Sequence, residues 1–227
     1  MLTTAQLGHG TPTVLVPLGS IEQHGPHLPL DTDIRIATAV ATAVADGMGD
    51  GVLVAPPIPY GAAGEHQGFP GTVSIGTQVL SRLLTEYGRS ACEWAARVVF
   101  VNGHGGNLEA LQASVGLLRD EGRDVAWCGC SVEGADAHAG HTETSVLLHL
   151  WPDAVRTAGI LPGNTEPLAA ILPRLRDGGM AAVSPSGVLG DPTTATAEAG
   201  EQIFASMVAG CRERIRRWQT GPGGLLT

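Results

Sequence analysis

The chain has 227 residues, 43% of them hydrophobic, and a formal net charge of −9 at pH 7, which fits a single globular domain over residues 1–227. All 13 basic residues are arginine, which excludes lysine chemistry such as a Schiff base or the phosphate-binding lysine of a P-loop. The acidic balance argues against nucleic acids and anionic membranes as partners.

Short valine-rich runs alternate with segments of helical period along the chain. We predict strands at residues 13–18, 52–55, 97–102 and 124–128, and helices at residues 34–45, 77–94, 108–119, 142–150 and about 196–218. Residues 152–192 are rich in proline and glycine, and we expect a connection there with one excursion from the body. The alternation predicts an α/β fold with a largely parallel sheet.

No apolar run has the length needed to span a bilayer, and the first residues lack the pattern of a signal peptide. We therefore expect a cytoplasmic protein without a membrane partner.

Polar side chains follow three of the predicted strands, where each strand ends. The segment EQH (residues 22–24) follows the first strand, with Asp33 at the start of the next helix, NGHGGN (102–107) follows the third, and DAHAGHTE (136–143) follows the fourth. Sites in open α/β sheets form beyond the carboxyl ends of the strands. Since parallel strands end at one edge, we expect these residues to converge.

The residue types at these strand ends suit a metal site. In an extended segment, residues two apart point the same way, so Glu22 and His24 can face one region. A carboxylate can bridge two cations, and neutral imidazole binds Zn, Mn and Fe. Each segment alone is more typical of a hydrogen-bonded structural histidine, and only the three together predict a metal site. Neither a G-x-S-x-G nor an H-E-x-x-H motif occurs in the sequence.

Four stretches resemble the creatininase (creatinine amidohydrolase) family. They are VPLGSIEQHGPHLP (16–29), DTD (31–33), NGHGGN (102–107) and ETS (143–145). The resemblance implies a three-layer α/β/α sandwich and a hydrolase that acts on amide-type bonds with two divalent metal ions per chain. Zn, Fe(II) and Mn(II) all suit such ligands. It also implies a homo-oligomer, such as a hexamer or a similar ring.

The resemblance assigns roles to individual residues. Glu22 and His104 would bind one metal and His24 the other, with Asp33 as the bridge. Creatinine-hydrolysing members have an acidic ligand two residues after the histidine of the N-G-H loop, where this chain has Gly106.

Glu143 is therefore the candidate that completes the shell of the second metal, and whether it acts as a ligand or as a general base stays open. His138 matches a family histidine near the substrate and would transfer a proton, or alternatively orient a ligand.

Later segments indicate the substrate. IPYGAAGEHQ (58–67), HAGHTETSVLLHL (138–150) and GVLGDPTTAT (187–196) are similar to a peptidase branch of the family, which releases a modified C-terminal Val-Tyr dipeptide from a small precursor peptide. Residues 132–137 lack the aromatic side chain that stacks on creatinine in other members.

The loops also hold candidate substrate-binding residues, which are Glu65, His66, Gly105 and Gly106. A small-molecule amidohydrolase that acts on a cyclic amide or formamide, and a non-catalytic metal-binding module, remain as alternatives. We expect His9, His141 and His149 to be structural.

Overall fold

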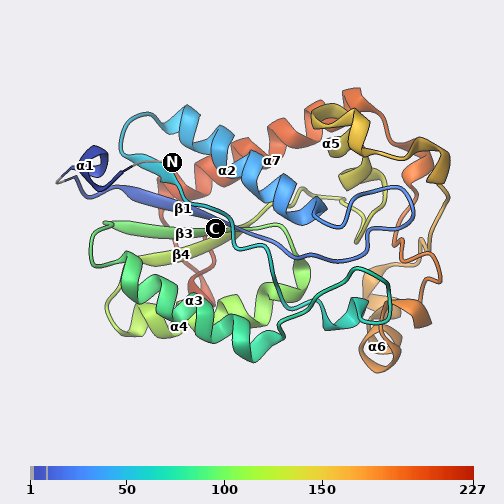
Figure 1. Cartoon of the computed structure of the whole chain (residues 1–227), viewed down its shortest axis with the longest axis horizontal. Coiled ribbons are helices and arrows are strands. Elements are labelled where there is room, and N and C mark those ends of the chain that lie inside the picture. Colours follow the sequence, from blue (N-terminus) through green and yellow to red (C-terminus); the bar gives the residue numbers. More distant parts are fainter. Residues whose placement is uncertain (1–2, 9) are drawn as a thin grey trace.

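The fold is built on a sheet of four parallel strands, and the computed structural model describes residues 3–8 and 10–227. The strands are β1 (Thr13–Leu18), β2 (Val52–Val54), β3 (Arg97–Asn102) and β4 (Val125–Gly129), and their order in the sheet is β2-β1-β3-β4. In the register, Val14 pairs with Val98 and Phe100 pairs with Trp127. All strands therefore end at the same edge of the sheet (Figure 1).

Helices cover both faces of the sheet and confirm the three-layer architecture (Figure 1). The α-helices of the described residues are α1 (Thr4–Leu7), α2 (Thr32–Met48), α3 (Thr77–Ala91), α4 (Leu108–Asp120), α5 (His141–Leu150), α6 (Leu168–Gly178) and α7 (Ala197–Arg217). Helices α2, α5 and α7 pack on one face, and α3 and α4 on the other. None of the helices within the described ranges is both long and apolar enough to cross a membrane.

The apolar runs of the strands supply two separate cores. Successive side chains of a strand point to opposite faces, so Leu15 and Val99 join the core under α2, α5 and α7. Val14 and Phe100 join the core under α3 and α4. Because both faces are covered, the strands are apolar throughout rather than alternating with polar residues.

The predicted elements agree with the structure except at some ends and in two segments, one of which is the short helix α1 that we did not predict. Helix α2 begins at Thr32 rather than residue 34, which places Asp33 in its first turn, and α3 ends at Ala91 because residues 92–94 form a turn. Residues 152–192 contain α6, which we did not predict. Pro173 lies inside this helix, and we did not predict the helix because proline usually ends one.

Two residues, Asn107 and Gly103, allow the site loops to pack together at the edge of the sheet. Asn107 accepts a hydrogen bond from the backbone N–H of Ala62 at 2.9 Å and donates to the carbonyl of Gly19 at 3.0 Å. It thereby ties together the loops that follow β1, β2 and β3. Gly103 lies against the first turn of α2, where an added Cβ atom would be 2.6 Å from the carbonyl oxygen of Asp33.

We predict that Gly103→Ala lowers the free energy of unfolding by roughly 1–3 kcal/mol, because the new methyl group must displace the backbone at Asp33. Chemical denaturation measures this change. Gly105→Ala is the matched control, since a Cβ atom there has no neighbour within 4 Å, and its stability should not fall. An equal loss in both variants would contradict the close packing at Gly103.

Candidate metal centre

The loop after β1 turns back on itself and brings two acidic residues and a histidine together. Glu22 and His24 lie in this loop and Asp33 begins α2, and all three are buried. Gly25 adopts a left-handed conformation with φ of 65°, which only glycine adopts at little cost. The N–H of Glu22 donates to the carbonyl of Leu30 at 3.1 Å. As a result, the ring of His24 lies 3.0 Å from Asp33.

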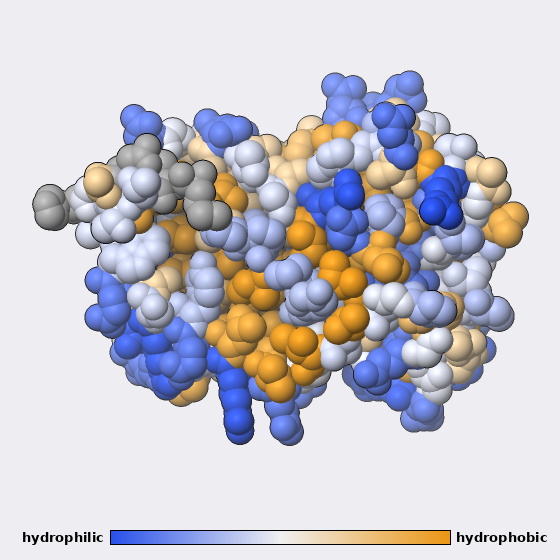
Figure 2. All heavy atoms as spheres, viewed as in Figure 1, coloured by the Kyte–Doolittle hydropathy of each residue, from blue (hydrophilic) through white to orange (hydrophobic). Residues whose placement is uncertain are grey.

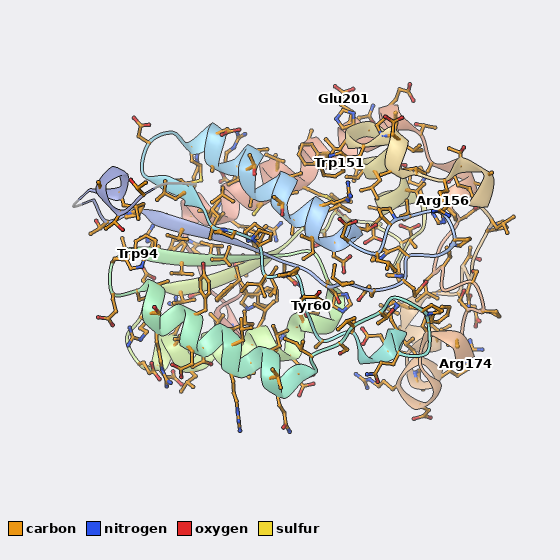
Figure 3. The ribbon with its side chains drawn as sticks, viewed as in Figure 1. Tyr60, Trp94, Trp151, Arg156, Arg174 and Glu201 are labelled. Atoms are coloured by element: carbon orange, nitrogen blue, oxygen red, sulfur yellow. The ribbon has the colours of Figure 1, made fainter. Side chains whose placement is uncertain are left out.

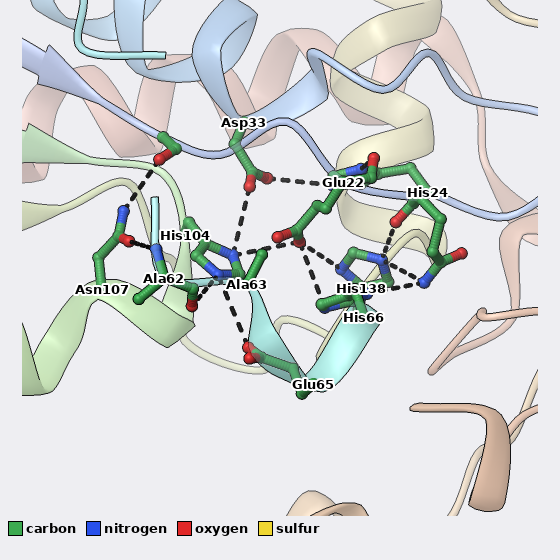
Figure 4. Close-up of polar contacts among 12 residues, drawn as sticks. Glu22, His24, Asp33, Ala62, Ala63, Glu65, His66, His104, Asn107 and His138 are labelled. Carbon is green, nitrogen blue, oxygen red and sulfur yellow. Dashed lines mark hydrogen bonds and ion pairs between the residues drawn. The ribbon is translucent and has the colours of Figure 1, made fainter. Parts of the chain in front are cut away.

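The loop after β3 adds His104 to this cluster (Figure 4). Its Nδ1 atom lies 3.1 Å from Glu22 Oε1 and 3.3 Å from Asp33 Oδ2. One ligand atom from each of Glu22, Asp33 and His104 lies within 4.8 Å of the other two. These three residues could therefore hold one metal ion.

Glu143, near the start of α5, completes a second group. His24 Nε2 is 3.0 Å from Asp33 Oδ1 and 3.8 Å from Glu143 Oε2, and the ligand atoms of these three residues again lie within 4.8 Å of one another. Asp33 turns one oxygen toward His104 and the other toward His24. This arrangement suits a carboxylate shared by two ions.

The charges of the cluster fit a cation. In the described part of the chain, neither oxygen of Glu22 accepts a hydrogen bond, and Oδ2 of Asp33 accepts none. The ion pairs of both residues in residues 3–8 and 10–227 are with histidine, and none is with arginine. Burying an ionised carboxylate costs several kcal/mol or more unless it is paired or binds a metal. Protons on His24 and His104, or a divalent ion in their place, would supply the compensating positive charge.

The pKa values of these groups are shifted by the same burial and by the neighbouring charges. Burial, and then the charge of Asp33, raises the pKa of Glu22, and burial raises that of Glu143 to about 7. Burial alone would lower the pKa of His104, but Glu22 and Asp33 raise it well above its usual range. Protons on these groups therefore offset the negative charge of the carboxylates. Metal ions would compete with those protons for the same ligand atoms.

His138 lies beside this cluster, and its hydrogen bonding fixes which nitrogen carries the proton. Nε2 lies 2.8 Å from the backbone oxygen of Gln23, so Nε2 carries the hydrogen in the neutral ring. Nδ1 is then unprotonated and lies 3.6 Å from Glu22 Oε1. With Glu22 and His24, His138 forms a third group of atoms within 4.8 Å. A lone pair that faces a carboxylate needs a proton or a cation between them.

Gln23 is a site residue that sequence reasoning missed. Its side-chain oxygen accepts a hydrogen bond from the N–H of Gly25 at 2.9 Å, and its amide nitrogen donates to the carbonyl of Gly187 at 3.0 Å. The same nitrogen lies 2.9 Å from His66 Nδ1, which leaves the proton of His66 on Nε2, 3.3 Å from Glu22 Oε1. Its position between Glu22 and His24 in the EQH motif was the one available signal.

Gly106 cannot carry the acidic side chain found in creatinine-hydrolysing members. A Cβ atom there would overlap the carbonyl oxygen of Ala62 and lie 2.6 Å from Glu65 Oε1. Glu65, from the 3-10 helix Gly64–His66, therefore occupies the space beside Gly106. Its carboxylate lies 3.6 Å from His104 Nε2, on the ring edge opposite the metal-binding group.

The cluster opens into a cavity of about 620 Å³. Its polar wall contains Asp33, His104, His138 and Glu143, together with the predicted substrate-binding residues Glu65, His66, Gly105 and Gly106. Leucines of α6 form an apolar wall. Glu22 and His24 lie beneath the cavity, where the protein buries them completely.

The other histidines contact protein side chains outside this cluster. His141 Nδ1 lies 2.9 Å from Thr194 Oγ1, and the ring of His149 packs near Phe204. His27 Nε2 lies 2.9 Å from Thr144 Oγ1. His9 lies outside the described residues.

Known proteins resemble this chain over nearly its whole length. The family model described as creatinine amidohydrolase matches residues 2–215. A mycofactocin precursor peptide peptidase from Mycolicibacterium smegmatis is 65% identical, with 99% of this chain and 93% of that protein covered. Creatinine amidohydrolase from Pseudomonas putida is 29% identical, with coverages of 93% and 92%.

The fold has solved counterparts as well. A mutant creatininase complexed with creatine superimposes with a TM-score of 0.78 at 28% identity, with 95% of this chain and 96% of that chain covered. A structure described as creatininase Mn gives a TM-score of 0.76 at the same identity, covering 94% of this chain and 93% of that one. Sequence and structure agree, and the chain belongs to the creatininase family.

Proposed function

We propose that this chain is a metal-dependent peptidase that releases the modified C-terminal Val-Tyr dipeptide from the mycofactocin precursor peptide. The observation that carries the proposal is the buried group of Glu22, Asp33 and His104, which borders a cavity and whose carboxylates pair with histidines rather than with arginine among the described residues. The mycobacterial relative at 65% identity supports the peptide substrate.

Two sets of residues would hold the ions. Glu22, Asp33 and His104 form one set and His24, Asp33 and Glu143 the other, with Asp33 common to both. Zn, Fe(II) and Mn(II) suit these ligands, and neighbouring family structures are described with Mn and Zn. When bound, such ions lower the pKa of water toward neutrality and polarise the scissile carbonyl.

His138 is the proposed proton carrier. Its Nδ1 atom is unprotonated because Nε2 donates to the backbone oxygen of Gln23. Nδ1 can accept the proton of the attacking water and deliver it to the departing nitrogen, so that the amide bond breaks and no serine or cysteine nucleophile is needed. Gln23 fixes the orientation of the ring during both transfers.

A creatinine-type small amide is the second candidate substrate, and the structure of this chain argues against it. Residues 132–137 offer no aromatic ring to a flat heterocycle, and the cavity has a long apolar wall on α6 that such a polar molecule would not cover.

The decisive test of the function uses the metal-loaded protein and a precursor peptide that carries the modified Val-Tyr unit. Mass spectrometry should show the dipeptide and the correspondingly shortened peptide, and removal of metal by a chelator should stop the reaction. Hydrolysis of creatinine but not of the peptide would overturn the proposal.

Glu143→Gln tests the second set of ligands. The amide keeps the shape of the side chain but loses the charge that would bind metal, so bound metal should fall toward one ion per chain and turnover should fall by at least 100-fold. Elemental analysis and peptide cleavage measure the two effects. Glu133→Gln, an exposed acid in the loop before His138, should change neither, and full metal content in Glu143→Gln would remove Glu143 from the ligands.

The chain is also proposed to form a homo-oligomer, such as a hexameric ring. Figure 2 shows hydrophobic side chains gathered over the segment after β2 and the nearby part of α3. The exposed apolar residues of these elements include Tyr60, labelled in Figure 3, and Val79 and Leu83. Such patches mark interaction sites, and β2 is an edge strand. The cytoplasmic location expected from the sequence stays a prediction.

Val79→Glu should weaken this assembly, because Val79 is 56% exposed near the start of α3 and the new charge would be buried on association. Analytical ultracentrifugation should then show smaller species than for the wild type. Leu117→Glu on α4 serves as the control, since it is a similar exposed apolar position on another helix. A monomeric wild type would contradict the proposal.

A further inference from the structure

We infer that the cavity-facing side of α6 is a binding surface for an apolar segment of the peptide substrate, next to the bond that is cleaved. This inference rests on the proposed peptidase function and adds the chemistry of the residues that the cavity accepts. Three observations support it: the spacing of the leucines, the independent anchoring of the helix, and the contrast between the two walls.

The leucines of α6 form one continuous face. Leu168, Leu172 and Leu175 are four and three residues apart, a spacing that places side chains on the same side of a helix. All three line the cavity, and Met180 and Leu189 continue the apolar surface beyond the helix.

Two leucines of this face, Leu168 and Leu172, are not required to hold the helix in place. A small cluster of its own anchors α6, separate from the two cores of the sheet, and it consists of Ile171, Met180, Val183 and Leu189 with Phe69 and Leu175 packed against them. Leu168 and Leu172 do not belong to that cluster. Leu168 is 46% exposed and Leu172 is half-buried, so both present apolar surface to the cavity.

The outer side of the helix is polar. Arg174 is exposed and pairs with Glu166 at 2.7 Å, and it lies at the end of the molecule where α6 is seen (Figure 3). The helix is therefore amphipathic, and its leucines face the cavity, which Arg176 near the end of the helix also lines. Such a face gains free energy only when a ligand covers it.

The two walls of the cavity differ in polarity, and together they determine which class of substrate fits. The wall with Asp33, His104 and Glu143 attracts the scissile amide, and the α6 wall attracts hydrocarbon side chains. A small polar amide would satisfy the first wall and leave the leucines in water. A peptide with apolar residues beside the scissile bond covers both walls, so the cavity fits that class of substrate.

The test compares Leu168→Asn and Leu172→Asn with the wild type on two peptides, one apolar beside the scissile bond and one with serine at those positions. We expect KM for the apolar peptide to rise about tenfold in each variant, because a polar amide removes the apolar contact. The value of kcat, the metal content and KM for the serine peptide should change little, so the preference of the wild type for the apolar peptide should largely disappear.

Leu161→Asn is the matched control, because Leu161 is 59% exposed and does not line the cavity; its KM should equal that of the wild type. If both α6 variants keep the wild-type preference, the inference is wrong while the peptidase function stands. If the wild type cleaves neither peptide but does cleave a small amide, the proposed function itself fails. Circular dichroism checks that the variants remain folded.

Discussion

The carboxylates of Glu22 and Asp33 lie buried with oxygen atoms that accept no hydrogen bond within the described residues. A charge in that position is unstable unless a cation or a proton compensates it. His104, from the loop after β3, and His138, from the segment after β4, lie beside these carboxylates, and Glu143 adds a third carboxylate from α5. The proposed metal sites and the proposed hydrolysis depend on these buried carboxylates and on the histidines around them.

The order and direction of the strands bring the residues of this cluster together. Four parallel strands end at one edge, so residues far apart in sequence meet there without long excursions of the chain. Asn107 links the loops through three hydrogen bonds, to Ala62, Gly19 and Asn102. Gly103 and Gly106 let backbones approach where a side chain would collide. The positions of the proposed ligands are therefore set by the shared edge of the sheet and by close backbone contacts at the glycines, rather than by a single rigid motif.

The strands could be predicted from the sequence because each is a short apolar run. The convergence of the polar loops could then be predicted because parallel strands end at one edge of the sheet. The sequence also revealed the missing acid at position 106, but not why it is missing, which depends on the carbonyl of Ala62 and on Glu65. Gln23 and α6 escaped prediction for different reasons. The contacts of Gln23 with Gly187 and His66 join residues far apart in the chain, and Pro173 interrupts the helical pattern of α6.

The metal content and stability of Asp33→Asn test the central claim most directly, since Asp33 is common to both proposed sets of ligands. Elemental analysis should find two ions per chain in the wild type and close to none in the variant. In the metal-free state, denaturation should show the variant to be less stable than the wild type, because the substitution removes the charged partner of the buried His24 and His104. A variant that retains two ions, or a wild type that binds none, would contradict the account.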